Sequence, residues 1–403
     1  MKYLVILGDG MADYPISEFN GKTVLDVANK PNIDYMSMHG ELGLVKTVPD
    51  GLKPGSDVAN LSVLGYEVKN CYTGRSPLEA ASIGVDLKDN DVTFRANLVT
   101  LSDDEPFENK VMQDYSAGEI TPDEAKELID AVEKELHTDF IHFYSGVSYR
   151  HLLVWTGGST NVKLTPPHDI SDKKIGEYLP CGDNGDKLLE LMKRSNEILK
   201  NHPVNQKRVK EGKNPATSLW FWGEGTKPKI DNFKEKFGIS GSMISAVDLL
   251  KGIAICAKMK SIDVPGATGN WDTNFDGKAQ AAFDTLTKDG QDFVYIHMEA
   301  PDECGHQGNA EKKKLSVELI DEKVVGFLKD TLDNHNIEYK MLILPDHPTP
   351  VSLKTHVADP VPYIIYSSKQ AEESGLCYNE ENGKKTGVYF DSGAELMKHF
   401  LEK

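Results

Sequence analysis

The chain has 403 residues and a formal net charge of −18, with a pI near 5.1. This length exceeds what one hydrophobic core usually organises, so we expect two domains. The acidic balance argues against a nucleic-acid partner, and it would repel an anionic substrate unless positive charge is gathered locally. Apolar runs are too short to cross a bilayer, and residues 3–7 enter a strand pattern without a cleavable leader, which predicts a cytoplasmic protein without a membrane segment.

Arginine is scarce in this chain. Only five of the 45 basic residues are arginine, and three of these, Arg75, Arg95 and Arg150, fall between residues 75 and 150. Because lysine supplies most of the surface charge, the arginines are candidates for planar, bidentate binding of phosphate or carboxylate. Ordinary salt bridging explains each arginine equally well when it is taken alone.

The first strand pattern, residues 3–7, is a continuous apolar run that ends at Gly8-Asp9-Gly10. Such a run is typical of a buried strand in a parallel sheet. Asp9 therefore follows the carboxyl end of a strand. It is either a capping residue or an oxygen ligand whose glycine neighbours let other groups approach closely.

A second strand is expected at residues 42–48, followed by a loop rich in glycine and proline at 49–55. Apolar residues at 58, 61 and 64 then repeat at helical spacing, which places Ser56 at a helix N-terminus. Capping is the ordinary role of a serine there. The alternative is a nucleophile, because the helix dipole and free N–H groups favour negative charge. The sequence shows no His-Asp partner for Ser56, so a metal ion would have to activate it.

The pattern of expected helices and strands changes between residues 102 and 201. An amphipathic helix is expected at 125–136, a hairpin-like strand pair at 140–144 and 151–155, and a further helix at 185–200. These elements predict a small α+β domain inserted into the main one. Arg150 and His151 open the second strand of the pair and could point at a phosphate.

Strand and helix patterns then alternate again, with strands expected at 218–222 and 241–245 and helices at 248–257 and 278–287. A buried strand beginning at Phe293 ends close to Asp302 and His306. Their spacing of four lets one turn direct both side chains at one ion. A long amphipathic helix is expected at 312–332.

The apolar run at 341–344 is followed by Asp346, His347 and, nine residues later, His356. A turn with an exposed histidine explains the Asp-His pair alone. However, acidic or imidazole groups also follow the strands that end near Asp9 and Asp302. Because the carboxyl ends of parallel strands gather ligands, this repetition predicts a divalent metal site. A last strand is expected at 361–366.

Six stretches carry a family resemblance: 54–62 (PGSDVANLS), 72–80 (YTGRSPLEA), 94–100 (FRANLVT), 146–151 (GVSYRH), 300–306 (APDECGH) and 350–356 (PVSLKTH). In this order they resemble the archaeal-type branch of the cofactor-independent phosphoglycerate mutases, in the alkaline-phosphatase superfamily. The resemblance implies a central, mostly parallel sheet flanked by helices. It implies a discontinuous catalytic domain at 1–95 and 205–403, and an inserted substrate-covering domain at 96–204.

The resemblance also implies the chemistry of the site. It makes Asp302, His306 and His356 ligands of one divalent ion, manganese or zinc. The other ion would be bound by Asp9, Ser56, Asp346 and His347. Ser56 would be the nucleophile that carries the phosphoryl group between 3-phosphoglycerate and 2-phosphoglycerate, without 2,3-bisphosphoglycerate as a cofactor. The inserted domain would close over the substrate, a small phosphorylated anion, and exclude water. Arg75, Arg95, Arg150 and His151 would grip its phosphate and carboxylate.

Two departures and three alternatives stay open. Pro345 and Pro348 stand where the family pattern implies small polar residues, and they alter the loop that carries two ligands. Homoserine kinases of the same family use the same metal centre, but they need an acidic group for the substrate's ammonium. A metal-dependent phosphatase or sulfatase would transfer the group to water. A non-catalytic metal-binding module is disfavoured, because it would not need Ser56 at a helix start.

Overall fold

The structure, a computed structural model, describes residues 1–369 and 373–402 and divides into two compact units. The first unit combines Met1–Tyr72 with Lys229–Lys403, and the second is Thr73–Pro228. The second unit is wider than the insertion of residues 96–204 that the sequence suggests. Strand β3 (Asp91–Leu101) crosses residue 96, and it pairs with β9 (Ser218–Thr226), which lies beyond residue 204.

A large sheet forms the centre of the first unit. Within the described residues its strands follow the order β11-β10-β12-β1-β13-β14-β2-β15, and all neighbours from β11 to β13 are parallel. Strand β14 is antiparallel to both of its neighbours. The strand bounds are β1 Lys2–Gly8, β2 Glu41–Val45, β10 Gly241–Ile244, β11 Lys260–Ile262, β12 Phe293–Met298, β13 Tyr339–Leu344, β14 Val361–Ser367 and β15 Tyr389–Phe390. The expected mostly parallel α/β sheet is confirmed.

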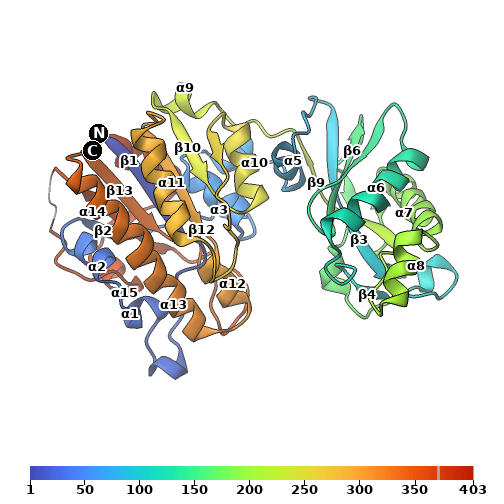
Figure 1. Cartoon of the computed structure of the whole chain (residues 1–403), viewed down its shortest axis with the longest axis horizontal. Coiled ribbons are helices and arrows are strands. Elements are labelled where there is room, and N and C mark those ends of the chain that lie inside the picture. Colours follow the sequence, from blue (N-terminus) through green and yellow to red (C-terminus); the bar gives the residue numbers. More distant parts are fainter. Residues whose placement is uncertain (370–372, 403) are drawn as a thin grey trace. The chain divides into compact units, whose positions relative to one another are not determined.

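Helices cover both faces of this sheet. They are η1 Ser17–Phe19, α1 Val24–Val27, α2 Pro31–Met38, α3 Ser56–Val63, α4 Val68–Cys71, α9 Phe233–Phe237, α10 Asp248–Cys256, α11 Phe275–Thr287, α12 Ala300–His306, α13 Ala310–Ile320, η5 Asp321–Gly326, α14 Phe327–Asn334, α15 Glu380–Lys385 and α16 Gly393–Glu402. Figure 1 shows α11 and α14 side by side along the strands. The helix expected at 312–332 runs from α13 through a π-helical turn, η5, into α14.

Alternation along β1 divides its side chains between two cores. Leu4 and Ile6 join one apolar cluster with buried residues of α11 and α14. Tyr3 points the other way and meets the ring of Phe400 in α16, with ring centroids 5.6 Å apart. Because both faces are covered, β1 is a continuous apolar run from Tyr3 to Leu7, as in other buried parallel strands.

The second unit is built on an antiparallel sheet, β4-β3-β6-β5, with β9 on the other edge of β3. Its elements are α5 Ser76–Ser82, β3, η2 Phe107–Asn109, β4 Met112–Asp114, α6 Pro122–Leu136, β5 Ile141–Tyr144, β6 Arg150–Thr156, β7 Val162–Lys163, η3 Pro167–Ile170, η4 Gly176–Tyr178, β8 Cys181–Gly182, α7 Gly185–Leu199, α8 Pro203–Lys210 and β9. The expected strand pair is β5 and β6, which are antiparallel. Apolar residues of α6 and α7 pack on one sheet face.

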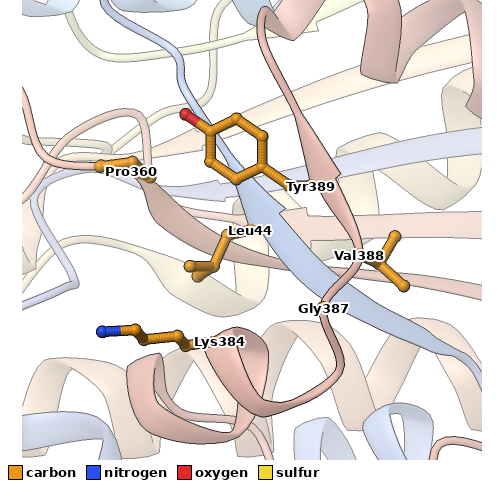
Figure 2. A pocket seen from close by; sticks show the side chains of 6 residues that line it. All are labelled: Leu44, Pro360, Lys384, Gly387, Val388 and Tyr389. Atoms are coloured by element: carbon orange, nitrogen blue, oxygen red, sulfur yellow. The ribbon is translucent and has the colours of Figure 1, made fainter.

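A pocket of about 410 Å³ lies at the β2–β15 edge of the large sheet. Figure 2 shows Tyr389 and Val388 beside Leu44, with Lys384 below them. Its described lining offers neither carboxylate nor imidazole groups, and β2 and β15 are not the strands that Asp9, Asp302 and Asp346 follow. The pocket is therefore separate from the predicted metal ligands. None of the helices in the described part of the chain is both long and apolar enough to cross a membrane.

Candidate metal centre

Three adjacent parallel strands, β12, β1 and β13, deliver the acidic ligands. Asp9 directly follows β1, Asp346 comes two residues after β13, and Asp302 lies in α12, which follows β12. All three carboxylates are buried. Because the strands are parallel neighbours, their carboxyl ends meet at one edge of the sheet, where ligand sites of α/β proteins form.

Gly10 makes this convergence possible. Its φ of +63° lies in the left-handed region, and its N–H donates to Asp346 Oδ1 at 3.1 Å. A Cβ atom there would stand 2.7 Å from Asp302 Oδ1. Glycine therefore allows both the turn and the close approach of the two carboxylates.

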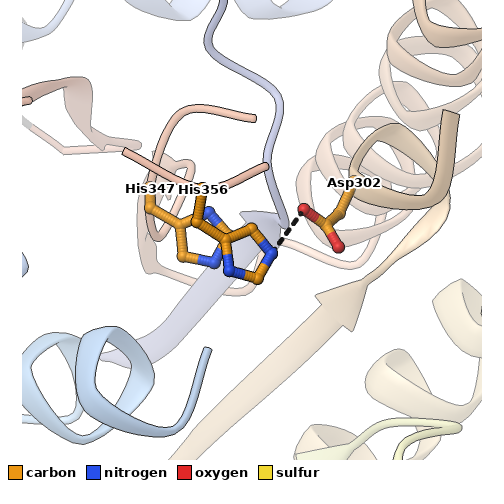
Figure 3. Close-up of side chains that lie close together, drawn as sticks. All are labelled: Asp302, His347 and His356. Atoms are coloured by element: carbon orange, nitrogen blue, oxygen red, sulfur yellow. Dashed lines mark ion pairs between the residues drawn. The ribbon is translucent and has the colours of Figure 1, made fainter. Parts of the chain in front are cut away.

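The first predicted ligand set, Asp302, His306 and His356, comes together. Asp302 lies 3.2 Å from His306 Nε2 and 3.3 Å from His356 Nε2, and the two Nε2 atoms are 2.9 Å apart. Figure 3 shows the His356 ring pointing at Asp302, with the His347 ring beside it; the two ring centroids are 4.0 Å apart and the rings are tilted by 34°. The hydroxyl of Thr349 donates to Asp302 Oδ1 and orients it.

The second predicted set, Asp9, Ser56, Asp346 and His347, also converges. The Ser56 hydroxyl lies 3.3 Å from Asp9 Oδ2 and 3.4 Å from His347 Nε2. That nitrogen is 3.4 Å from Asp346 Oδ2 and 3.7 Å from Asp9 Oδ1. The Ser56 hydroxyl, the predicted nucleophile, thus lies among the other predicted ligands of this set.

The grouping of ligand atoms differs from the predicted sets at three histidines: His306 is outside both groups, His347 falls in the first group, and His297 falls in the second. Atoms of Asp302, His347 and His356 lie within 4.8 Å of one another, as do atoms of Asp9, His297 and Asp346. His347 is therefore within reach of both groups, and its assignment to the second ion stays a prediction. His297 was not among the predicted site residues. The available signal was its position in β12, two residues from the strand's acidic end.

The prolines of the ligand loop do not keep Asp346 and His347 apart. The backbone N–H of His347 donates to Asp346 Oδ1 at 2.9 Å, which holds the two residues in a tight turn. Pro348 forms an isolated bridge to Met11, beside the loop that follows β1. The altered loop thus still brings both side chains to the centre.

Ser56 is the first residue of α3 but does not cap the helix. The N-cap is Gly55, without a side-chain cap bond, and the Ser56 hydroxyl points instead to Asp9 and His347. The side chain is half-buried. Of the two roles that the sequence left open, the structure favours chemistry over capping.

Burial and mutual repulsion govern the carboxylates. Burial, and then the charges of Asp346 and Asp302, hold the pKa of Asp9 well above its usual range. Burial alone would raise the pKa of Asp302, but hydrogen bonds from His306 and His356 keep it well below its usual range. The carboxylate of Asp302 in turn raises the pKa of His306 to about 9. The buried charges of Asp346 and Asp302 therefore act against ionisation of Asp9, whereas His306 and His356 favour the ionised form of Asp302.

These residues fit divalent cations. Asp9 Oδ1 is buried and has no hydrogen-bond partner, although a buried oxygen normally has one. In the other set, the Nε2 atoms of His306 and His356 lie 2.9 Å apart, and each is close to one oxygen of Asp302. Carboxylates, imidazoles and a hydroxyl form the mixed oxygen and nitrogen set that zinc and manganese accept.

The predicted substrate arginines lie in the second unit, around Glu79. The Nε atoms of Arg75 and Arg95 are 3.1 and 3.0 Å from the two carboxylate oxygens of Glu79. Arg150 is opposite Asn97 in the β3–β6 pair. The pKa of Arg95 is lowered mainly by its burial, and further by the positive charges of Arg75 and Arg150. Three arginines against one glutamate leave an excess of positive charge.

His151 is not grouped with these arginines. It pairs with Ala96, so strand alternation places it on the sheet face opposite that of Arg95. Its Nδ1 accepts the Gly146 N–H at 3.1 Å, and its buried Nε2 has no hydrogen-bond partner. His168, which was not predicted, does belong to the arginine face. Its ring lies 5.3 Å from that of Trp222, which also stacks under Arg95.

Comparison with known proteins places this geometry in a family. Residues 38–205 match the family model described as 2,3-bisphosphoglycerate-independent phosphoglycerate mutase. A Geobacter sulfurreducens protein, named a probable mutase of this kind, is 49% identical over the full length of both chains. The chain belongs to this family. A Methanosarcina barkeri mutase is 48% identical over 98% of each chain.

Two solved structures agree with the fold. The cofactor-independent phosphoglycerate mutase of Thermoplasma acidophilum matches with a TM-score of 0.65 and 26% identity, covering 100% of this chain and 99% of that one. A Pyrococcus horikoshii protein matches with a TM-score of 0.82 and 30% identity, covering 100% and 97%. The resemblance seen in the sequence motifs is confirmed.

Metal content tests the two ligand sets. We expect two divalent ions per chain in a fully active preparation, measured by elemental analysis. Chelation should lower the unfolding midpoint, because ions that bind only the folded state stabilise it by about 2.7 kcal/mol at 100 times their Kd. One ion or none in the fully active protein would overturn the ligand assignment.

Proposed function

We propose that this chain interconverts 3-phosphoglycerate and 2-phosphoglycerate through a phosphoserine at Ser56. The observation that carries the proposal is the position of the Ser56 hydroxyl. It lies at the start of α3, within 3.4 Å of both a buried aspartate and a buried histidine. A hydroxyl placed at a helix start among metal-type ligands suits a nucleophile better than a cap.

The reaction has two transfers through this one oxygen. Ser56 Oγ attacks the phosphorus of 3-phosphoglycerate, the bond from phosphorus to the glycerate O3 breaks, and O3 takes a proton. The O2 hydroxyl of the retained glycerate then attacks the phosphoserine, releases Ser56 Oγ and loses its proton. Two divalent ions, manganese or zinc, would lower the pKa of Ser56 and neutralise the transferring group.

The residues that hold Ser56 are also assigned roles. We assign Asp302, His306 and His356 to one ion, and Asp9, Asp346 and His347 together with Ser56 to the other. The α3 N-terminus supplies N–H groups and a positive dipole end near the phosphoryl oxygens. These features favour negative charge at Ser56 Oγ.

Substrate binding is assigned to the second unit. Arg75, Arg95 and Arg150 give the guanidinium groups that grip phosphate and carboxylate in bidentate fashion. Both carboxylate oxygens of Glu79 are engaged by Arg75 and Arg95, which favours an anionic substrate over one with an ammonium group. His151 keeps a predicted substrate role through its unpaired Nε2.

The relatives' names support the choice of substrate. Both curated relatives described above are named 2,3-bisphosphoglycerate-independent phosphoglycerate mutases. On that basis 2,3-bisphosphoglycerate is not required as a cofactor. A cytoplasmic location, the lack of a nucleic-acid partner and the identity of the ions stay predictions.

A coupled assay tests the proposal directly. Purified enzyme supplemented with Mn²⁺ should convert 3-phosphoglycerate to 2-phosphoglycerate without added bisphosphoglycerate, measured through enolase. Parallel reactions contain homoserine with a phosphoryl donor, and 3-phosphoglycerate with phosphate release as the readout. Activity on homoserine alone would refute the mutase assignment, and release of phosphate without mutase turnover would indicate a phosphatase.

A further inference from the structure

Strand β12 presents two buried polar side chains to the second ligand set. Tyr295 and His297 are two residues apart, so they point to the same face of the sheet. Tyr295 pairs with Val5 and His297 with Leu7, whose strand leads directly to Asp9. Both side chains are fully buried, although polar groups in a strand interior are costly unless they are hydrogen-bonded.

His297 holds Asp9 through a defined tautomer. Its Nε2 lies 2.9 Å from Asp9 Oδ2, and its Nδ1 lies 3.3 Å from the Ser245 hydroxyl. The Ser245 oxygen already accepts the Val247 N–H at 3.0 Å, so its hydrogen is available to His297 Nδ1. His297 therefore carries its own hydrogen on Nε2 and donates it to Asp9.

Tyr295 orients Asp346 indirectly, through Asn60. Its hydroxyl donates to Asn60 Oδ1 at 2.6 Å, which fixes the orientation of the Asn60 amide. The two hydrogens of Asn60 Nδ2 go to Asp346 Oδ2 at 2.9 Å and to the Ser56 carbonyl at 2.8 Å. One amide thus links a carboxylate ligand to the backbone of the residue that carries the nucleophile.

These hydrogen bonds reach particular oxygen atoms of Asp9 and Asp346. His297 engages Asp9 Oδ2, whereas the buried Asp9 Oδ1 has no hydrogen-bond partner. Both oxygens of Asp346 are oriented, Oδ1 by the Gly10 N–H and Oδ2 by Asn60. These hydrogen bonds thus orient both carboxylates, and partners of this kind raise the metal affinity of a site.

We propose that Tyr295 and His297 are positioning residues for the ion bound by Asp9 and Asp346, acting through Asn60 and directly on Asp9. The inference rests on the proposed two-ion centre. It assigns to β12 a role in only one of the two sites, because the Asp302, His306 and His356 set does not share these hydrogen bonds. Neither residue is needed to contact the substrate.

Metal binding to full-length variants tests this proposal. Equilibrium dialysis against graded free Mn²⁺ should show two sites in the unmodified enzyme. His297→Leu should weaken one site by about 10- to 100-fold and leave the other unchanged. His297→Gln, which keeps a donor near the Nε2 position, should restore most of the affinity. Tyr295→Phe should weaken the same site by a smaller factor.

Tyr339→Phe is the matched control. Tyr339 is a buried tyrosine at the start of β13, and its hydroxyl also donates to a side-chain oxygen, Asp333 Oδ1, at 3.2 Å. This variant should keep both affinities. Activity lost in His297→Leu should return at high Mn²⁺, a rescue that general damage to the fold would not produce.

Several results would overturn the proposal: unchanged affinity in both His297→Leu and Tyr295→Phe, equal weakening of both sites, or a His297→Gln variant as weak as His297→Leu. If His297→Leu does not fold, unchanged affinity in Tyr295→Phe is decisive. The mutase assay distinguishes failure of the proposed function from failure of this proposal. If the unmodified enzyme did not act on 3-phosphoglycerate, the proposed function would fail, but His297→Leu would still be expected to weaken one Mn²⁺ site.

Discussion

Ser56→Ala should abolish mutase turnover, with a loss of at least about 10⁴-fold in kcat. The variant removes the oxygen that would carry the phosphoryl group, and no water molecule can return that group to glycerate. It should remain folded, because Ser56 does not cap α3 and its side chain is only half-buried. The measurements are the enolase-coupled rate, the unfolding midpoint and the Mn²⁺ content.

Ser392→Ala is the control for this prediction. Ser392 also precedes a helix of the first unit, α16, and its hydroxyl accepts the Glu395 N–H at 3.1 Å. Losing this cap should cost about 1 kcal/mol of stability and leave the mutase rate intact. Substantial residual activity in Ser56→Ala would remove Ser56 from the nucleophile role.

Asp302→Asn should be almost as damaging, with a loss of at least about 10³-fold in kcat/KM and one ion fewer per chain. The substitution keeps the size of the side chain but removes the charge that draws His306 and His356 together. It also takes away the anion that raises the pKa of His306. Elemental analysis and the coupled assay give the two readouts.

Asp321→Asn is the matched control for the loss of a buried carboxylate. Asp321 is buried in the first unit and accepts hydrogen bonds from the N–H groups of Asn32 and Ile33 in α2. Its replacement should lower stability by about 1–3 kcal/mol while both ions and the activity remain. An Asp302→Asn enzyme with two ions and normal turnover would contradict the ligand set.

The parallel sheet and its ligand edge could be predicted from sequence because each signal is local. Apolar runs such as residues 3–7 and 341–344 each end at an aspartate, and burial on both faces makes such runs continuous. The positions of Asp9 and Asp346 follow from this pattern. Their convergence with Ser56 depends on the order of strands, and it was expected only from the family resemblance.

The boundary between the two units, and the roles of His297 and His168, could not be predicted from local sequence patterns. β3 mixes polar and apolar residues, yet all 11 of its residues are buried because β6 and β9 flank it. Its pairing with β9 joins residues more than 100 positions apart, so it has no local signal. The same is true of His297, whose importance comes from Asp9 on a neighbouring strand, and of His168, which approaches the arginines only through folding.

The most direct test of the central claim is to look for the phosphoryl group on Ser56. Enzyme supplemented with Mn²⁺ is mixed with 3-phosphoglycerate, quenched in acid during turnover and digested, and its peptides are examined by mass spectrometry. A phosphoryl group on Ser56 that appears with substrate and disappears when the substrate is removed is the predicted result. An unmodified Ser56 in an actively turning-over enzyme, or a phosphoryl group on another residue, would contradict the account.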